Sequence, residues 1–310
     1  MTKYIKNIKR IEFTVTYACN SRCRHCLTVH RDREKKIDAS RAAELVTDMA
    51  AALDIQSVMT FGGEPLLHLE AVKAIHQAAL QAGIPHRQLI TNGGIWAQEA
   101  DVDQQAAALL SSGINEVLLS VDTFHMEFIP LTRQHAFAKA LKDRGFGGLR
   151  LNPVWVLERE DNNIFNMETE ECLKIFEDLS LPAGEGNRII PEGNAKKYLK
   201  RFYKRGNFDE AFQCGDMPYT QRLDSPEVIS VEPGGEVAVC GFSIGNIYEK
   251  DIMAILEGYD PYKNPMMAAL LDGGLLSLQR YAREQGLEAS LSDCYTPCEF
   301  CRKVQLLAGN

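Results

Sequence analysis

The chain has 310 residues, of which 45% are hydrophobic and 25% charged, and its formal net charge at pH 7 is −8. This composition is ordinary for a globular protein and excludes wholesale disorder, while the acidic balance disfavours nonspecific binding to nucleic acid. The first residues lack an apolar signal-peptide region, and no apolar run approaches the roughly 18 residues of a membrane span. We therefore expect a cytoplasmic protein that does not enter a membrane.

From residue 10 to about residue 195, strand-like segments alternate with amphipathic helical segments. Strands are expected at 10–18, 57–63, 86–94, 116–124, 148–157 and 187–193. Helices are expected between them at 38–53, 69–83, 102–113, 133–145 and 167–181. This alternation, with almost no hairpin signals, predicts a parallel sheet, and right-handed crossovers would curl it into a full or partial barrel.

The pattern changes after about residue 205. A hairpin is predicted over 228–240, where Pro-Gly-Gly supplies the turn, and helices are predicted over 243–258 and 265–286. The expected fold is therefore α/β: a partial (β/α)6 barrel of the TIM type over residues 1–205, followed by a small α+β extension over residues 206–310.

Cys19, Cys23 and Cys26 lie within eight positions just after the first predicted strand. In a reducing compartment, clustered cysteines indicate metal or redox chemistry rather than disulfides. Three thiolates can hold three irons of a [4Fe–4S] cubane and leave the fourth iron open to an external ligand. A zinc knuckle or a redox-active C-x2-C pair is the alternative.

The motif CNSRCRHC after the first strand, GGEP after the second and SVD after the fourth resemble the radical S-adenosylmethionine (SAM) enzymes over residues 10–195. The resemblance implies that Cys19, Cys23 and Cys26 ligate a [4Fe–4S] cluster whose open iron binds the amino and carboxylate groups of SAM. It also implies that a flavodoxin- or ferredoxin-type reductant supplies an electron, and that the resulting 5′-deoxyadenosyl radical removes a hydrogen from a substrate.

Further cofactor contacts are expected at the carboxyl ends of the strands, where barrel enzymes place their working residues. Gly62, Gly63 and Glu64 match the family's GGE motif; the glycines would let the backbone approach the methionine amino group, and Glu64 would add a negative partner. A strand-to-helix turn, with Pro65 starting the helix, is the alternative. Asn92, in TNGG, follows a pattern common in the family, and a tight turn is its alternative.

The fourth, fifth and sixth strands supply the remaining candidates. Ser120 and Asp122 would contribute to the ribose and carboxylate of SAM, and Arg150 and Asn152 can do similar work because arginine pairs bidentately with carboxylates. Period-two alternation places Arg150 and Asn152 on one face, which we expect to point inward; an exposed strand start is the alternative for Arg150. Ile190 would pack against adenine or belong to the core.

Five further cysteines lie beyond residue 205: Cys214, Cys240, Cys294, Cys298 and Cys301. A hairpin ending in cysteine, then SIGNI, then a C-terminal cysteine group resembles the auxiliary-cluster extension called SPASM, or its shorter form, twitch. The expected second [4Fe–4S] cluster uses Cys240, Cys298 and Cys301, with Cys214 or Cys294 as the fourth ligand. A four-thiolate zinc site is the alternative.

Acid–base and substrate assignments depend on fewer signals. His125 titrates near neutrality and is the first candidate for moving a proton, with Glu127 and Glu192 as alternatives. Tyr17 would shape the pocket. The substrate is expected to be a peptide or a small molecule that is oxidised. An RNA-modifying radical enzyme, and an iron–sulfur carrier or zinc protein without SAM chemistry, are the alternatives; the sequence does not choose the substrate or the oligomeric state.

Overall fold

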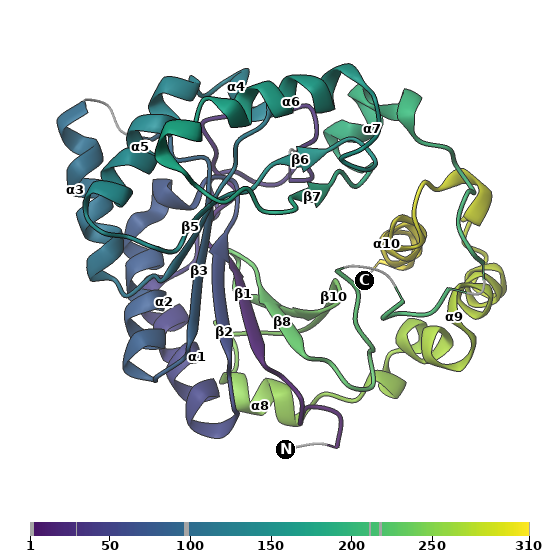
Figure 1. Ribbon diagram of the computed structural model, residues 1–310. Helices are drawn as coiled ribbons and strands as arrows, with labels where there is room; N and C mark the ends of the chain where they lie inside the picture. The colour runs from purple at the N-terminus through teal and green to yellow at the C-terminus, as the bar shows by residue number, and fades with distance from the viewer. Residues whose placement is uncertain (1–2, 29, 96–98, 211, 217–218, 310) are drawn as a thin grey trace.

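The computed structural model describes residues 3–309 apart from residues 29, 96–98, 211 and 217–218. Eight of the described strands form one sheet in the order β10-β9-β8-β1-β2-β3-β4-β5 (Figure 1). Its parallel part comprises β1 (Arg10–Thr14), β2 (Ser57–Phe61), β3 (His86–Thr91), β4 (Glu116–Leu119), β5 (Leu149–Leu151) and β8 (Val228–Val231). The predicted parallel sheet is confirmed.

Helices cover the outer face of this sheet, as Figure 1 shows for α1, α2, α3 and α5. Their bounds are α1 (Ala39–Ala52), α2 (Leu69–Gln81), α3 (Glu99–Ser111), α5 (Leu131–Asp143) and α6 (Ile164–Lys174), with short helices η1 (Pro65–His68), α4 (Thr123–Met126) and η2 (Glu177–Leu179). Asp38 caps α1 by accepting a hydrogen bond from the Arg41 amide. Gly83 follows α2 with a φ of +73°, a conformation that glycine adopts without strain.

The two faces of the parallel sheet differ in chemistry. Residues in register point to the same side, so one set of side chains packs under the helices and is fully buried: Ile11, Phe13, Val58, Leu89 and Val117. The opposite, inner face carries a polar ladder: Arg10 donates to Gln88, and Gln88 donates to Glu116. The helices thus supply the apolar core, while the inner face is available for polar contacts.

The fifth and sixth predicted strands differ from expectation. Pro153, which has no amide hydrogen to donate, divides the fifth segment into β5 and the short β6 (Val154–Trp155). β7 (Asn187–Arg188) pairs in parallel with β6 in a separate two-stranded sheet. The half-barrel therefore stops being continuous after β5.

The C-terminal segment continues the same sheet. The predicted hairpin is formed by β8 and β9 (Glu236–Val239), and β8 also pairs in parallel with β1. The helix predicted over 243–258 was wrong in its first half, because β10 (Phe242–Asn246) finds a hydrogen-bonding partner in β9 and only α8 (Ile252–Glu257) is helical. A boundary near residue 205 stays a prediction.

The remaining helices lie on the side opposite α1 and α2 (Figure 1). They are α7 (Asn194–Tyr198), η3 (Lys200–Phe202), η4 (Pro261–Lys263), α9 (Pro265–Glu284), η5 (Leu291–Asp293) and α10 (Pro297–Ala308). α9 is kinked where Gly273 and Gly274 leave helical geometry. None of the described helices is long and apolar enough to cross a membrane.

Candidate active site

The loop that carries Cys19, Cys23 and Cys26 follows β1 and is held against the end of β2. The Gly63 amide donates to the Thr16 carbonyl at 2.7 Å, and the Glu64 amide donates to the Ala18 carbonyl at 2.7 Å. A Cβ on Gly62 would lie 2.4 Å from the Thr16 oxygen, and one on Gly63 would lie 2.1 Å from the Ala18 oxygen. In this structure both glycines are required because the backbone leading into the cysteine loop passes directly over them.

Glu64 is 1% exposed, and its carboxylate accepts hydrogen bonds from three groups of the same chain. It accepts hydrogen bonds from the Leu66 amide at 3.0 Å, the Thr91 hydroxyl at 2.6 Å and the Asn92 amide at 2.8 Å. Burial raises its pKa, although the three donors act in the opposite direction. Glu64 therefore ties the end of β2 to the end of β3; its contact with SAM stays a prediction.

The loops after β1, β3 and β4 are joined by amide side chains. The Asn92 Nδ2 donates to the Asn20 Oδ1 at 2.8 Å, and the Asn20 Nδ2 donates to the Gly94 carbonyl at 3.0 Å. The buried Gln134 donates to the carbonyls of Asn92 and of Ser120. Sequence reasoning missed Asn20 and Gln134, because a single amide residue in a loop or helix carries no signal of its own.

A third brace comes from the segment after β7. The Asn194 side chain donates to the Cys23 carbonyl at 2.9 Å, and its amide donates to the Cys26 carbonyl at 3.0 Å. A Cβ on Gly193 would lie 2.4 Å from the Cys26 oxygen. Sequence reasoning also missed these two residues; a Gly-Asn pair at the end of a predicted strand was the signal that could have found them.

Cys19, Cys23 and Cys26 are thus presented on one loop that three strand ends hold in place. Burial raises the pKa of Cys19 and of Cys23, which disfavours thiolates in the absence of iron. Bound iron reverses this, because a coordinating thiol is deprotonated. The donor set, three sulfurs in a shielded loop, fits a [4Fe–4S] cluster. Within the described ranges, no group of three or more His, Cys, Asp or Glu side chains is gathered as around a single metal ion.

Asp122, which is buried, and His125, which is partly exposed, form a pair beside this loop. Asp122 caps α4 by accepting from the Phe124 and His125 amides, and its second oxygen lies 2.7 Å from the His125 Nδ1. Burial would raise the pKa of Asp122, but the charge and hydrogen bond of His125 outweigh it and lower that pKa. Burial would lower the pKa of His125, but Asp122 outweighs it and raises that pKa. The His125 ring lies 5.1 Å from the ring of His25 in the cysteine loop.

Of the alternatives to His125, Glu192 pairs with Arg302 of α10. Glu127 and the pocket candidate Tyr17 each have a partner near the cysteine loop. Glu127 accepts from the Nε of Arg24 at 2.7 Å, and Arg24 lies between two of the cysteines in sequence. The Tyr17 hydroxyl donates to Glu232 at 2.6 Å, in the turn between β8 and β9. Burial, followed by this hydrogen bond, raises the pKa of Tyr17. Each side chain is already held by a partner, so neither is positioned as a free base.

The candidates from the fifth and sixth predicted strands are spread along the sheet. Arg150 lies on the inner face, but its exposed guanidinium pairs with Glu116, the first residue of β4, at 3.2 Å. That end of β4 is opposite to the cysteine loop, which argues against a contact between Arg150 and the SAM carboxylate. Asn152 follows β5 and donates its amide to the Leu119 carbonyl. Ile190 is half-buried, and its neighbour Ile189 packs in the cluster that contains Cys23.

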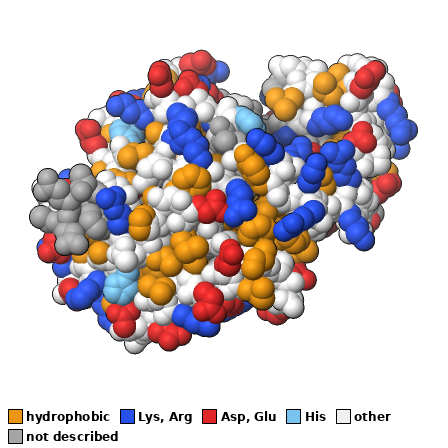
Figure 2. Space-filling model, turned by 90° about the horizontal axis from the view of Figure 1, so that it is seen from above, with side chains coloured by type: hydrophobic (Ala, Val, Ile, Leu, Met, Phe, Trp, Pro, Cys, Tyr) orange, Lys and Arg blue, Asp and Glu red, His pale blue; other side chains and the backbone are white. Residues whose placement is uncertain are grey.

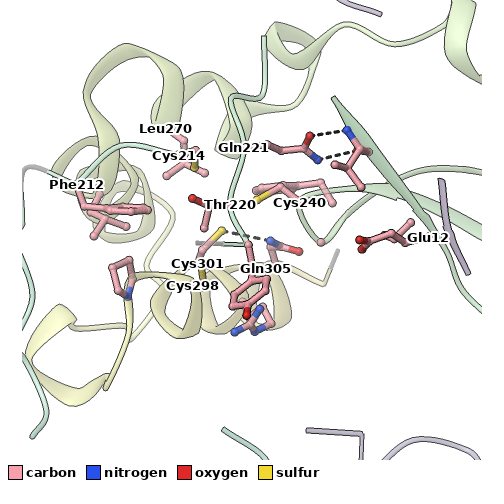
Figure 3. A pocket seen from close by; sticks show the side chains of 18 of the residues that line it. Glu12, Phe212, Cys214, Thr220, Gln221, Cys240, Leu270, Cys298, Cys301 and Gln305 are labelled. Atoms are coloured by element: carbon pink, nitrogen blue, oxygen red, sulfur yellow. Dashed lines mark hydrogen bonds between the residues drawn. The ribbon is translucent and has the colours of Figure 1, made fainter. Parts of the chain in front are cut away.

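Four cysteines of the second set line a cavity of about 560 Å³ between the sheet and the helices α9 and α10 (Figure 3). Cys214, Cys240, Cys298 and Cys301 all line it. Cys294 does not; it is 1% exposed, packs in the main core and donates to the Ser290 carbonyl. Of the two alternatives for a fourth ligand, the structure therefore places Cys214 with the other three.

The opposite wall of this cavity belongs to the inner face of the sheet. Arg10 and Glu12 of β1 line the cavity, and its other polar lining residues include Tyr219, Gln221 and Arg302. A hydrogen bond from Cys214 lowers the pKa of Cys240 to about 7, despite burial, and raises that of Cys214. The cavity therefore combines four sulfur donors with polar lining residues, and its volume lies within the range of small-ligand sites.

Comparison with known proteins agrees with this geometry. Residues 13–142 match the family model of the Radical SAM superfamily. A GTP 3′,8-cyclase of Chlorobaculum tepidum is 29% identical over 142 residues, which are 45% of this chain and 41% of that protein. A GTP 3′,8-cyclase of Clostridium acetobutylicum is 27% identical over 212 residues, 64% of each chain. This chain thus spans less than two thirds of the length of these curated relatives.

Solved structures show the same fold. SuiB of Streptococcus suis, bound to S-adenosylmethionine, superposes with a TM-score of 0.58 at 15% identity, covering 88% of this chain and 72% of that one. anSMEcpe with bound AdoMet superposes with a TM-score of 0.53 at 12% identity, covering 97% and 96%. The predicted α/β fold with an open barrel is confirmed. Residues 13–142 are thus similar to the radical SAM superfamily, and a [4Fe–4S] cluster and SAM are the cofactors that this family implies.

Proposed function

We propose that this protein reductively cleaves SAM at a [4Fe–4S] cluster held by Cys19, Cys23 and Cys26, and uses the product radical to remove a hydrogen from a small polar substrate. The observation that carries the proposal is the cysteine loop itself, which the ends of β2, β3 and β7 brace through backbone and amide hydrogen bonds. When bound, the cluster supplies one electron to SAM, giving methionine and a 5′-deoxyadenosyl radical.

The chain's own residues fix and shield the loop. Gly63 and Asn194 set the path of its backbone, and Glu127 holds Arg24 over the Phe165 ring, 4.9 Å from its centroid. Cys23 packs among apolar side chains. Such shielding excludes water and limits side reactions at the loop. His125, held by Asp122, is the group placed to accept or donate a proton at its Nε2, since Nδ1 faces the carboxylate.

We further propose that Cys214, Cys240, Cys298 and Cys301 hold a second [4Fe–4S] cluster, as in a SPASM or twitch extension. The support is their common cavity, which faces the polar inner surface of β1. The same cavity is the proposed substrate site. Its limited volume favours a small molecule over a long peptide, and the curated relatives are named for a guanine nucleotide. A purine nucleoside triphosphate is therefore the first substrate to test, ahead of a peptide.

The test is anaerobic reconstitution with iron and sulfide, followed by SAM and dithionite with and without GTP. We expect about eight irons per chain from two cubanes, together with 5′-deoxyadenosine and methionine. Cys23→Ala should abolish cleavage. Cys172→Ala is the matched control, since Cys172 is buried in α6 and belongs to the main core rather than to the cysteine loop.

The outcomes separate the levels of the proposal. No 5′-deoxyadenosine under any condition, with iron incorporated, refutes SAM cleavage. About four irons, with cleavage intact, refutes the second cluster. If GTP neither stimulates SAM cleavage nor is consumed, while a peptide library stimulates cleavage, the substrate is a peptide rather than a nucleotide.

A further inference from the structure

One short segment has a charge opposite to that of the whole chain. Residues 193–208 contain six Lys or Arg and no Asp or Glu. Because the whole chain has a net charge of −8, the rest of the chain carries −14. We call this segment the basic surface segment; its cations are Lys196, Lys197, Lys200, Arg201, Lys204 and Arg205. All six side chains are exposed.

The charges of this segment are only partly neutralised. Lys196 pairs with Glu299 at 2.5 Å. Lys197, Lys200 and Lys204 form no ion pair with any acidic side chain in the described part of the protein. Figure 2, which looks onto the upper end of the molecule in Figure 1, shows Lys and Arg side chains concentrated on the right-hand side, where α7 and α10 lie. Three adjacent, uncompensated lysines make a positive field on that side.

The basic surface segment is built onto the cysteine loop. Asn194, the first residue of α7, donates to the Cys23 carbonyl at 2.9 Å. On the inner side of the segment, Ala195 and Leu199 are fully buried in the same apolar cluster as Cys23. The Phe202 ring extends this contact, at 5.8 Å from the Phe165 ring. The lysines therefore stand on the outer surface of the layer that covers the first cluster site.

We propose that the basic surface segment is the docking site for an acidic one-electron carrier protein of the flavodoxin or ferredoxin class, which reduces the cluster held by the cysteine loop. This inference rests on the proposed SAM cleavage, which needs an electron at that cluster in each reductive event. In the step, the carrier is oxidised by one electron and the cluster is reduced by one, from the 2+ to the 1+ state, and no bond is made or broken.

Charge and position together favour this partner. Complementary charges speed association and fix its orientation, and a surface acidic elsewhere repels an acidic carrier from wrong positions. Electron tunnelling falls steeply with distance, so a productive carrier must dock where little protein separates it from the cluster. A nucleic acid is disfavoured, because proteins that bind it neutralise many phosphates, whereas this surface offers three uncompensated lysines.

The test is binding of a recombinant bacterial flavodoxin to the intact chain, measured by calorimetry at low and at physiological ionic strength. The variant Lys197→Glu/Lys200→Glu/Lys204→Glu should weaken binding by about 10- to 100-fold at low salt, with a smaller effect at high salt. The matched control, Lys6→Glu/Lys250→Glu/Lys263→Glu, makes the same change in net charge at three exposed lysines elsewhere. We expect it to leave the affinity within about threefold.

Two further measurements keep the outcomes distinct. Dithionite-driven SAM cleavage should be unchanged in both variants; its absence in the unmodified protein would refute the proposed function, not the docking site. Carbodiimide cross-linking of unmodified protein to flavodoxin, mapped by mass spectrometry, needs no variant to fold and should join Lys197, Lys200 or Lys204 to flavodoxin carboxylates.

Equal weakening by the two triple variants, unchanged affinity in the first, or cross-links confined to other lysines would each overturn the proposal. If the variant Lys197→Glu/Lys200→Glu/Lys204→Glu lost the binding of a 20-nucleotide single-stranded RNA but kept its affinity for flavodoxin, the surface would be assigned to nucleic acid instead.

Discussion

Gly63→Ala tests whether the cysteine loop depends on close backbone contact with β2. The new methyl group would lie 2.1 Å from the Ala18 oxygen, 2.6 Å from its carbonyl carbon and 2.7 Å from the Tyr17 oxygen. All three are backbone atoms, so no side chain can rotate away. The loop must move, and the bonds from the Gly63 and Glu64 amides to residues 16 and 18 are lost or stretched.

The cost can be worked from these contacts. Each backbone hydrogen bond contributes about 1 kcal/mol, and forcing a methyl group into a packed contact costs about 1–3 kcal/mol, so Gly63→Ala should destabilise by about 3–5 kcal/mol. Gly147→Ala is the matched control, because a Cβ there has no heavy atom within 4 Å and its φ is not positive. It should change stability by less than about 0.5 kcal/mol.

Urea unfolding of the apoprotein measures both variants, and iron and sulfide analysis after reconstitution measures the first cluster. We expect Gly63→Ala to lose about four irons as well as stability, since its loop carries three ligands. If Gly63→Ala matched Gly147→Ala in both unfolding free energy and iron content, the inference that Gly63 positions the loop would be refuted.

Three other changes test the second cysteine set and the Asp122–His125 pair. Cys301→Ser should lose about four of about eight irons, whereas Cys294→Ser should retain them all, because Cys301 lines the cavity and Cys294 does not; the reverse result would reassign the ligands. For the Asp122–His125 pair, the lowered pKa of Asp122 and raised pKa of His125 give stabilisation that is complete between about pH 4 and 6.5. It is lost as the pH rises through the raised pKa of His125. Asp122→Asn should therefore destabilise more at pH 5.5 than at pH 9, and an equal effect in unfolding experiments at both pH values would contradict this account.

Local sequence patterns predicted much of the fold for a physical reason. Helical periodicity and strand composition are properties of neighbouring residues, so the alternating elements from β1 to α6 could be placed without knowing their partners. β10 shows where this fails. The segment FSIGN can follow either a helical or a strand course, and it becomes a strand because β9 offers an unpaired edge.

The candidate site divides in the same way. The spacing of Cys19, Cys23 and Cys26 by itself determined a three-thiolate loop, since all three ligands come from one short segment. The second set draws on positions up to 87 residues apart, Cys214 to Cys301, and only the folded chain separates Cys214, at the cavity, from Cys294, in the core. Spacing cannot make that choice, because both cysteines lie at permissible distances along the chain.

What the sequence by itself determined is the family chemistry: a cysteine loop after the first strand, a GGE motif after the second, and the order of elements that brings strand ends to one edge. What only the tertiary structure decided is how that edge is held. The Asn194 side chain donates to the carbonyl of Cys23, 171 positions earlier in the chain. Gly63 lacks a side chain at the point where the backbone of the cysteine loop passes over it. Such contacts join segments far apart in the chain, and their energies depend on the folded path of the backbone, which no local pattern records.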